Sequence, residues 1–219
     1  MNDKTVLPAI SLSEIGSLRN IEPLEKEHTD GNVSIPELKI ICQLVDYHKP
    51  LGIFEIGTFD GRTTVNLAHF SPALAKVFTI DLLKKDINKT KYPLYSGDEL
   101  VGPDSLYIDK EETGLRYKNK NEKRKIVQLY GDTATFDFFS YINQMDFVFI
   151  DGSHAKDYVK NDTEIAIKLL RDNKGVLLWH DYGVWKDVTN VLENYFLSDS
   201  RFKNMKNIYG TTFIYLNLK

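Results

Sequence analysis

Short apolar runs alternate with helix-like stretches from residue 51 onward, and this alternation constrains the fold more than any other feature. Each run is short, mainly apolar and bounded by glycine or acidic residues, which is typical of a parallel strand buried on both faces. The apolar runs are 51–56, 75–80, 126–130, 146–150 and 176–179. The helical patterns are 62–70, 135–142, 155–171 and 185–196. Strand alternating with helix predicts a doubly wound α/β sheet with helices on both faces.

The part of the chain before the first run has a different character. Residues 1–33 show no clear period and are punctuated by proline and glycine, so we expect an irregular N-terminal arm. Ser34 and Glu37 have the spacing of a capping box, which predicts a helix that begins there and continues to His48. We therefore predict one folded domain over 34–219, preceded by the arm.

Two further segments depart from the alternation. The stretches 206–208 and 212–216 are interpreted as two short strands joined by a tight connection, which predicts a terminal hairpin with an antiparallel strand. The insert 84–125 is long and rich in glycine, proline, tyrosine and charge, and connections of this length are often lids or binding loops. Its basic run, 116–125, is interpreted as a solvated face, with a lid edge that attracts an anionic acceptor as the alternative.

The composition is that of an ordinary globular chain. Its 219 residues are 42% hydrophobic and 27% charged, which suffices for one sizeable core. A net charge of -3 gives no general attraction to nucleic acid or to an anionic membrane, so a small-molecule or protein partner is favoured. No apolar run has the length of a signal peptide or a membrane span, and we expect a cytoplasmic protein. The oligomeric state is left open, with a homodimer as the commonest arrangement.

The turn after the first apolar run carries a binding motif. Glu55, Gly57 and Gly61 form Glu-x-Gly-x-x-x-Gly, where a strand must turn tightly into a helix and free backbone N–H groups face a ligand. Dinucleotide sites require Gly-x-Gly-x-x-Gly, so a nicotinamide or flavin cofactor is disfavoured. Asp81 follows the second run and Asp132 follows the third. Acids therefore stand at three successive strand ends, where such sheets bind ligands.

These features in order resemble the S-adenosylmethionine (SAM) site of class I methyltransferases. The resemblance implies a Rossmann-like, mostly parallel sheet of seven strands that includes the C-terminal antiparallel hairpin. It implies that Glu55, Gly57 and Gly61 hold the methionine end of SAM. Asp81 would hold the ribose hydroxyls, and Asp132 would contact the adenine. Neighbouring residues expected to contact the same cofactor are Thr58, Phe59, Thr63, Gly131, Thr133 and Asp151.

Two acids and two histidines follow the fourth and fifth apolar runs. Asp151 and His154 belong to Asp-Gly-Ser-His, and His180 and Asp181 belong to Trp-His-Asp-Tyr. Neighbouring strand ends lie side by side, so we expect these side chains above one crevice, where they suit metal binding or proton transfer. An unperturbed histidine titrates at about pH 6.5, so a rate that needs neutral His154 should fall on the acid side. Asp162, on the apolar stripe of the next helix, is interpreted as structural.

The two motifs together are similar to a subfamily of class I methyltransferases that includes the sugar O-methyltransferases of macrolide antibiotics. In related metal-dependent O-methyltransferases the matching positions, here Asp151, His180 and Asp181, hold a divalent ion. His154 matches the histidine proposed as catalytic base in the macrolide enzymes. Catechol-type enzymes carry a carboxylate in place of His180, and magnesium prefers oxygen ligands. Either His180 is not a ligand, or a softer ion such as manganese replaces magnesium.

We therefore predict a SAM-dependent methyltransferase that acts on a hydroxyl of a small molecule, of sugar or natural-product type, with a divalent ion as helper. Two alternatives stay open: a protein that binds SAM without catalysis, and a metal-independent methyltransferase of another acceptor. Methylation of adenine in nucleic acid is disfavoured, because the enzymes resembling that chemistry have Asn/Asp-Pro-Pro-Tyr/Phe after the fourth strand. This chain has Asp-Gly-Ser-His there.

Overall fold

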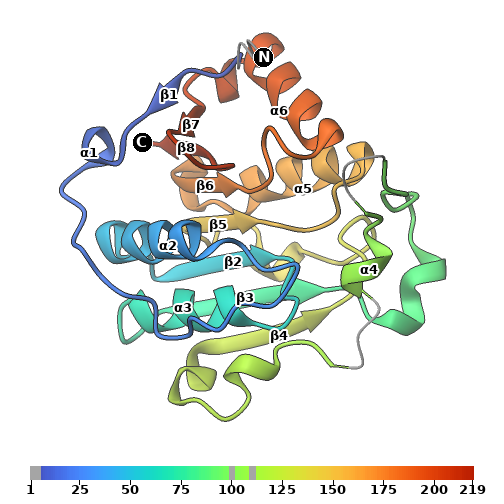
Figure 1. Cartoon of the computed structure of the whole chain (residues 1–219), viewed down its shortest axis with the longest axis horizontal. Coiled ribbons are helices and arrows are strands. Elements are labelled where there is room, and N and C mark those ends of the chain that lie inside the picture. The colour runs from blue at the N-terminus through green and yellow to red at the C-terminus, as the bar shows by residue number, and fades with distance from the viewer. Residues whose placement is uncertain (1–5, 99–101, 109–111) are drawn as a thin grey trace.

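A mostly parallel sheet of eight strands, in the order β1-β7-β8-β6-β5-β2-β3-β4, forms the centre of the molecule (Figure 1). The computed structural model describes residues 6–98, 102–108 and 112–219. β8 runs antiparallel to β6 and β7, and the other pairs are parallel, so the predicted α/β class and terminal hairpin are confirmed. The strands are β1 (Ala9–Ile10), β2 (Gly52–Ile56), β3 (Lys76–Asp81), β4 (Ile126–Tyr130), β5 (Phe147–Ile150), β6 (Gly175–Trp179), β7 (Lys206–Ile208) and β8 (Ile214–Leu218).

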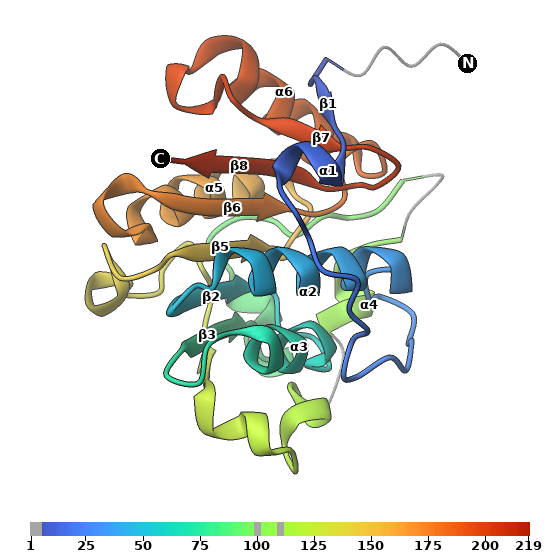
Figure 2. The ribbon, with the colours of Figure 1, turned by 90° about the vertical axis from the view of Figure 1, so that its left-hand side faces the viewer.

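Helices cover both faces of the sheet, with α2 and α3 in front and α5 behind in the view of Figure 2. The α-helices are α1 (Leu12–Ile15), α2 (Ile35–His48), α3 (Arg62–Phe70), α4 (Ser105–Ile108), α5 (Lys156–Leu169) and α6 (Lys186–Ser198). The 3-10 helices are η1 (Lys84–Lys89), η2 (Leu115–Tyr117), η3 (Asn121–Lys125), η4 (Phe139–Tyr141), η5 (Arg171–Asn173) and η6 (Ser200–Phe202). Within the described part of the chain, no helix combines the length and apolar character needed to cross a membrane.

The central strands are mainly apolar because they contribute to two cores. In β2, Ile53 packs into the core beneath α2 and α3, while Phe54 packs into the core beneath α5 and α6. In β5, Phe149 and Val148 divide in the same way. Successive side chains of a strand point to opposite faces, so a sheet covered on both sides favours apolar residues on both faces.

The arm is more regular than predicted. The prediction of an irregular segment is wrong for residues 9–15, which form β1 and α1. β1 pairs in parallel with β7 and makes the sheet one strand wider than the seven predicted. A strand of two residues is too short to show a period, and this explains why the sequence pattern did not indicate it. Leu7, just before β1, is buried in the core with α5 and α6.

The helix predicted over 135–142 is wrong, since the structure forms only the single 3-10 turn η4 there. Asp132 accepts a hydrogen bond from the Ala134 N–H, and Asp137 accepts one from the Phe139 N–H, both at 2.9 Å. Aspartate side chains that bond the backbone two residues on compete with helix formation. The capping box of α2 is confirmed, because Ser34 and Glu37 exchange hydrogen bonds between side chain and backbone.

Candidate functional site

A cavity of about 1200 Å³, counted with its open mouth, lies at the carboxyl edge of the sheet. β2 pairs with β3 on one side and with β5 on the other, so the chain reverses its winding direction there. Open α/β sheets bind ligands in the crevice at such a point. The predicted residues that line the cavity are Gly57, Thr58, Phe59, Thr63, Asp81, Gly131, Asp132, Thr133, Asp151, His154, His180 and Asp181. Two predicted cofactor residues, Glu55 and Gly61, lie outside its lining.

The turn after β2 is built from backbone that only glycine adopts easily. Gly57 has a φ of 97°, and a Cβ added to it would lie 1.9 Å from the carbonyl oxygen of Asp151. Gly61 has a φ of 86° and precedes α3, where an added Cβ would lie 2.7 Å from the Tyr117 ring. Gly57 therefore lets the ends of β2 and β5 approach each other, while Gly61 shapes the start of α3.

Glu55 lies behind this turn and is fully buried. The hydroxyl groups of Thr64 and Thr79 donate to its Oε2, and its Oε1 has no hydrogen-bond partner among the described residues. Burial raises the pKa of Glu55 to about 8, against the opposing effect of the two threonines. The carboxyl group is therefore neutral at pH 7 and supports the turn from within the protein. The resemblance implied a direct cofactor contact, and the structure places Glu55 away from the cavity wall.

Asp81 and Asp132 reach the cavity from the ends of β3 and β4. Asp81 accepts hydrogen bonds from the backbone N–H groups of Phe59 and Leu82, both at 2.9 Å. Asp132 accepts one from the Tyr158 hydroxyl at 2.8 Å, in addition to its backbone contacts. These bonds hold each carboxylate in one orientation beside the cavity, as a site for ligand hydroxyl or amino groups requires.

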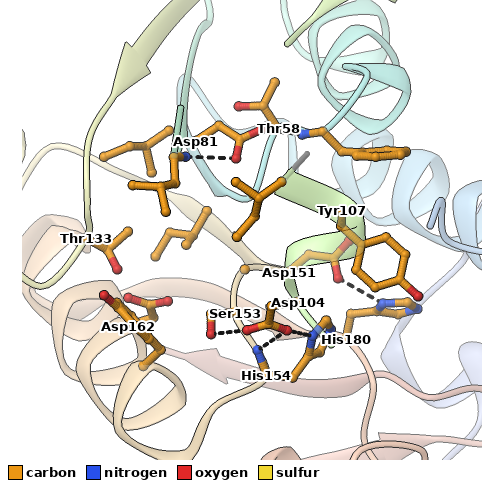
Figure 3. Close-up of a pocket in the computed structure, with 18 of the residues that line it drawn as sticks. Thr58, Asp81, Asp104, Tyr107, Thr133, Asp151, Ser153, His154, Asp162 and His180 are labelled. Atoms are coloured by element: carbon orange, nitrogen blue, oxygen red, sulfur yellow. Dashed lines mark hydrogen bonds and ion pairs between the residues drawn. The ribbon is translucent and has the colours of Figure 1, made fainter. Parts of the chain in front are cut away.

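Asp162 also lines the cavity, although the sequence placed it among structural residues. Its side chain projects from α5, is 2% exposed, and accepts a hydrogen bond from Asn161 at 3.0 Å. Burial raises its pKa to about 6, in spite of hydrogen bonds from Thr133 and Asn161. Figure 3 shows Asp162 and Thr133 along one side of the cavity, well apart from His180. Asp162 is therefore a wall residue of this site.

The ends of β5 and β6 bring an imidazole between two carboxylates. The His180 Nδ1 lies 2.9 Å from Asp151 Oδ1 and 3.2 Å from Asp181 Oδ2. Although burial opposes its charge, these carboxylates raise the pKa of His180 well above the usual value. His180 and His154 in turn hold the pKa of Asp181 well below its usual range, again against burial. Ligand atoms of Asp151, His180 and Asp181 lie within 4.8 Å of one another, a spacing that suits a metal ion.

His154 is held between two carboxylates of its own. Its Nδ1 lies 2.6 Å from Asp104 Oδ1, and its Nε2 lies 2.9 Å from Asp181 Oδ2. The ring stacks on Trp185, with centroids 3.6 Å apart and planes inclined by 8°. Burial disfavours the charged ring, yet the two carboxylates raise the pKa of His154 to about 9. The expectation of an unperturbed pKa near 6.5 is therefore wrong for this histidine.

The basic run of the insert is engaged by the arm. Arg116 donates to Asp60 at 2.9 Å and to Glu27 at 3.2 Å, and Lys120 lies 2.8 Å from Glu25. The alternative of a free basic edge that attracts anions is not supported for Arg116 and Lys120, because both are paired with carboxylates. These contacts tie the insert to the segment that precedes Gly31, Asn32 and Val33, which line the cavity mouth.

Several residues of the site were not predicted from the sequence. Asp104, Tyr107 and Trp185 line the cavity, and Glu37 lies behind His180, with Oε2 3.6 Å from Nε2. Glu37 was recognised only as part of a capping box. Asp104 and Tyr107 belong to the insert, where no period indicates which side chains turn inward. A signal was available only for Trp185, at the predicted start of α6.

Solved structures with the same fold come from several organisms. The O-methyltransferase TomG from Streptomyces achromogenes, involved in tomaymycin synthesis and crystallised with SAM, is 19% identical with a TM-score of 0.55, covering 86% of this chain and 82% of that one. The SAH-bound methyltransferase PaMTH1 from Podospora anserina is 14% identical with a TM-score of 0.59, covering 87% and 81%. The O-methyltransferase from Bacillus cereus in complex with SAH is 16% identical with a TM-score of 0.56, covering 87% and 84%.

Comparison with curated proteins gives no match. A family model described as a methyltransferase domain matches residues 54–182. This range is more than half of the chain, and it runs from β2 to the residue after Asp181, so it includes the turn, the acids at three strand ends and both histidines of the site. The chain therefore belongs to this family of methyltransferase domains.

Proposed function

We propose that the protein is a SAM-dependent methyltransferase that methylates a hydroxyl of a small molecule with the help of a divalent ion. The observation that carries the proposal is the order of groups around one cavity. A glycine turn and the acids Asp81 and Asp132 stand at the strand ends β2 to β4, and a cluster of acids and histidines follows at β5 and β6. Solved O-methyltransferases of the same fold, crystallised with SAM or SAH, support this interpretation.

The strand ends β2 to β4 are the proposed cofactor side. The close approach of Gly57 to Asp151 leaves backbone, rather than side chains, to face the methionine end of SAM. Asp81 is proposed to accept the two ribose hydroxyls, and Asp132 to contact the adenine. A SAM sulfonium is cationic, so a cavity rich in carboxylates suits it electrostatically.

The strand ends β5 and β6 are the proposed reaction side. The methyl group of SAM is already activated, so the protein chiefly aligns the acceptor oxygen, methyl carbon and sulfur. His154 is the proposed proton acceptor for the hydroxyl. Since Asp104 and Asp181 raise its pKa to about 9, the ring must first lose a proton before it can act as a base.

The donor set of Asp151, His180 and Asp181 fits a divalent ion. Two carboxylates and one imidazole converge, and the capping-box residue Glu37 lies beside Nε2 of His180. A carboxylate that accepts from the second nitrogen of a ligating histidine fixes the ring, which leaves Nδ1 toward the other donors. When bound, such an ion would hold the acceptor oxygen and acidify its hydroxyl. An imidazole in the set favours manganese over magnesium.

The charge of the cavity narrows the acceptor class. Among the described residues that line it there is no lysine or arginine. The carboxylates of its lining are Asp60, Asp81, Asp104, Asp132, Asp151, Asp162 and Asp181. An acceptor with phosphate or carboxylate groups would meet this negative field with no lysine or arginine to pair with, and the two histidines of the lining are already paired with aspartates. We therefore propose an uncharged or cationic acceptor, and the sugar hydroxyl of the macrolide subfamily meets this condition.

Calorimetry with SAM tests the cofactor assignment. Asp81→Ala should weaken SAM binding by about 100-fold or more, because two hydrogen bonds to a charged acceptor are lost and each contributes about 1.5–3 kcal/mol. Asp86→Ala is the matched control, since Asp86 lies on η1 with Lys89 as its partner and does not line the cavity. Unchanged affinity in Asp81→Ala would refute the assignment.

Methyl transfer from labelled SAM tests the reaction. A panel of neutral, cationic and phosphorylated hydroxyl compounds is offered to the protein before and after exhaustive chelation, with manganese or magnesium then restored. Turnover of neutral or cationic acceptors that depends on the added metal supports the proposal. Tight SAM binding with no turnover would favour a non-catalytic binder, and turnover that survives chelation would favour a metal-independent enzyme.

A further inference from the structure

We propose that Asp104, supplied by the insert, is a positioning residue that fixes the imidazole of His154 for proton transfer. This inference rests on the proposed function, in which His154 faces the acceptor. Figure 3 shows Asp104, Ser153 and His154 gathered at the part of the cavity opposite Asp81. Asp104 precedes α4, whereas His154 follows β5, so the contact joins the insert to the sheet.

The carboxylate of Asp104 is 3% exposed and each of its oxygens has defined partners. Among the described residues, the partner of Oδ1 is His154, at 2.6 Å from Nδ1 and 3.4 Å from the backbone nitrogen. Oδ2 accepts from the Ser153 hydroxyl and, at 3.0 Å, from the Tyr95 N–H. A buried carboxylate is costly unless it is paired, and this one is paired chiefly with the Ser-His segment. A residue needed only to close its own loop would require no more than the Tyr95 contact.

Asp104 determines which edge of the His154 ring points into the cavity. Trp185 stacks on the ring face and restricts its tilt, but stacking does not decide which edge points into the cavity. The bond from Nδ1–H to Asp104 decides it, because it places Nε2 on the side of Asp181 and the cavity. A carboxylate on one ring nitrogen sets the tautomer that leaves the other nitrogen available as a base.

Nitrogen-15 NMR of histidine-labelled protein tests the positioning directly and needs no acceptor. The chain has five histidines, and His154→Ala identifies the His154 ring signals. In Asp104→Ala the two ring nitrogen shifts of His154 should move, while those of His48 and His69 stay in place. Asp98→Asn is the matched control, since Asp98 accepts from the Tyr95 hydroxyl on the same insert but lies off the cavity lining. Identical His154 shifts in Asp104→Ala and wild type would overturn the proposal.

Kinetics provide the second measurement. Asp104→Ala should lower kcat by about 10- to 100-fold, as expected for loss of a carboxylate that orients a histidine, with SAM affinity unchanged. Asp104→Asn keeps one accepting oxygen and should recover part of the loss. Equal kcat in all three proteins would overturn the proposal. Should Asp104→Ala fail to fold, Asp104→Asn, which keeps the shape, carries both measurements. Absence of turnover in wild type would count against the proposed function, while the NMR result would still decide the positioning role.

Discussion

The strand-end turns and the insert line the same cavity but are held in place differently. The turn after β2 is fixed by backbone, since Gly57 touches the Asp151 carbonyl and the sheet sets the position of both. The insert is held largely by side chains, among them the bonds of Asp104 to Ser153 and His154 and the contacts of Arg116 with the arm, beside backbone bonds from Gly114 and Arg116 to the turn. A backbone-built region tolerates little change, whereas a side-chain-built region can vary without loss of the fold.

This contrast explains how one fold can keep its cofactor and change its acceptor. Groups attached to the sheet are expected to hold SAM, and groups from the insert and arm surround the opposite part of the cavity. Changes to the first region should cost stability together with binding. Changes to the second should alter the reaction while the protein stays folded.

The largest effect is expected for Gly57→Ala, which breaks the backbone-built region. The new Cβ would meet the Asp151 carbonyl oxygen, and the φ of 97° is unfavourable for alanine. We expect destabilisation of at least about 3 kcal/mol, measured by urea unfolding. Gly210→Ala is the control, because Gly210 has a φ of 78° with no atom within 4 Å of the added Cβ. Similar losses in the two variants would show that crowding at Gly57 is unimportant.

His154→Ala breaks the side-chain-built region. It should lower kcat by about 100- to 10,000-fold, the usual range for loss of a proton acceptor, with the fold and SAM affinity preserved. His69→Ala serves as a control, since His69 bonds Glu122 away from the cavity. Full activity in His154→Ala would remove this residue from the mechanism.

The pH dependence of the rate tests the role of the carboxylates around His154. They raise its pKa to about 9, and only the neutral ring accepts a proton. The wild-type rate should therefore rise with pH until about 9, by about 100-fold from pH 7 since each pH unit is tenfold. His154→Ala should lack this rise. A midpoint near 6.5 would show that Asp104 and Asp181 do not act on the ring during turnover.

Glu55→Gln tests whether the buried Glu55 carboxyl behind the turn is neutral. The unfolded chain releases the Glu55 proton above pH 4.5, while the folded protein keeps it until about pH 8. Folding thus takes up a proton in this interval, and stability falls as pH rises. The Gln variant lacks this pH-dependent loss of stability, so its stability relative to wild type should rise by on the order of 3 kcal/mol between pH 5 and 8. Parallel unfolding curves at all pH values would contradict the buried neutral carboxyl.

Arg116→Ala should have the smallest effect. Arg116 joins the insert to Asp60 and Glu27, and its side chain is 14% exposed. Its removal should cost about 1 kcal/mol and speed hydrogen exchange in the arm segment 24–32. Arg201→Ala, which removes an ion pair with Glu164 elsewhere, should leave that segment unchanged. Unaltered exchange in Arg116→Ala would show that other contacts hold the arm.

The sequence predicted the backbone-built region well. Parallel strands buried on both faces are mainly apolar, so β2 and β5 are visible in the sequence, and α3 forms over the predicted range 62–70. Polar residues that follow such strands must lie at one sheet edge, and Asp81 and Asp151 do so. Their roles toward SAM and metal stay predictions.

The side-chain-built region was beyond this kind of prediction. Asp104 meets His154 across 50 residues, and no period in the insert relates the two positions. The surroundings of a residue also change the pKa and the role that its type alone suggests. His154 was expected to titrate normally, but its pKa depends on a carboxylate whose position the sequence does not reveal. Glu55 was expected at the ligand and is instead buried behind it.

The contacts of Glu37 determine when this part of the site can form during synthesis. It accepts hydrogen bonds from the backbone and hydroxyl of Thr212 at 2.9 and 2.8 Å, across 175 residues, while it faces His180. During synthesis α2 leaves the ribosome long before Thr212 exists, and contacts so distant along the chain form late. A nascent chain that already has β2 to β6 and His180 would therefore still lack the Thr212 contacts that hold Glu37 beside His180. This part of the site is complete only once the terminal hairpin has emerged and closed onto the sheet.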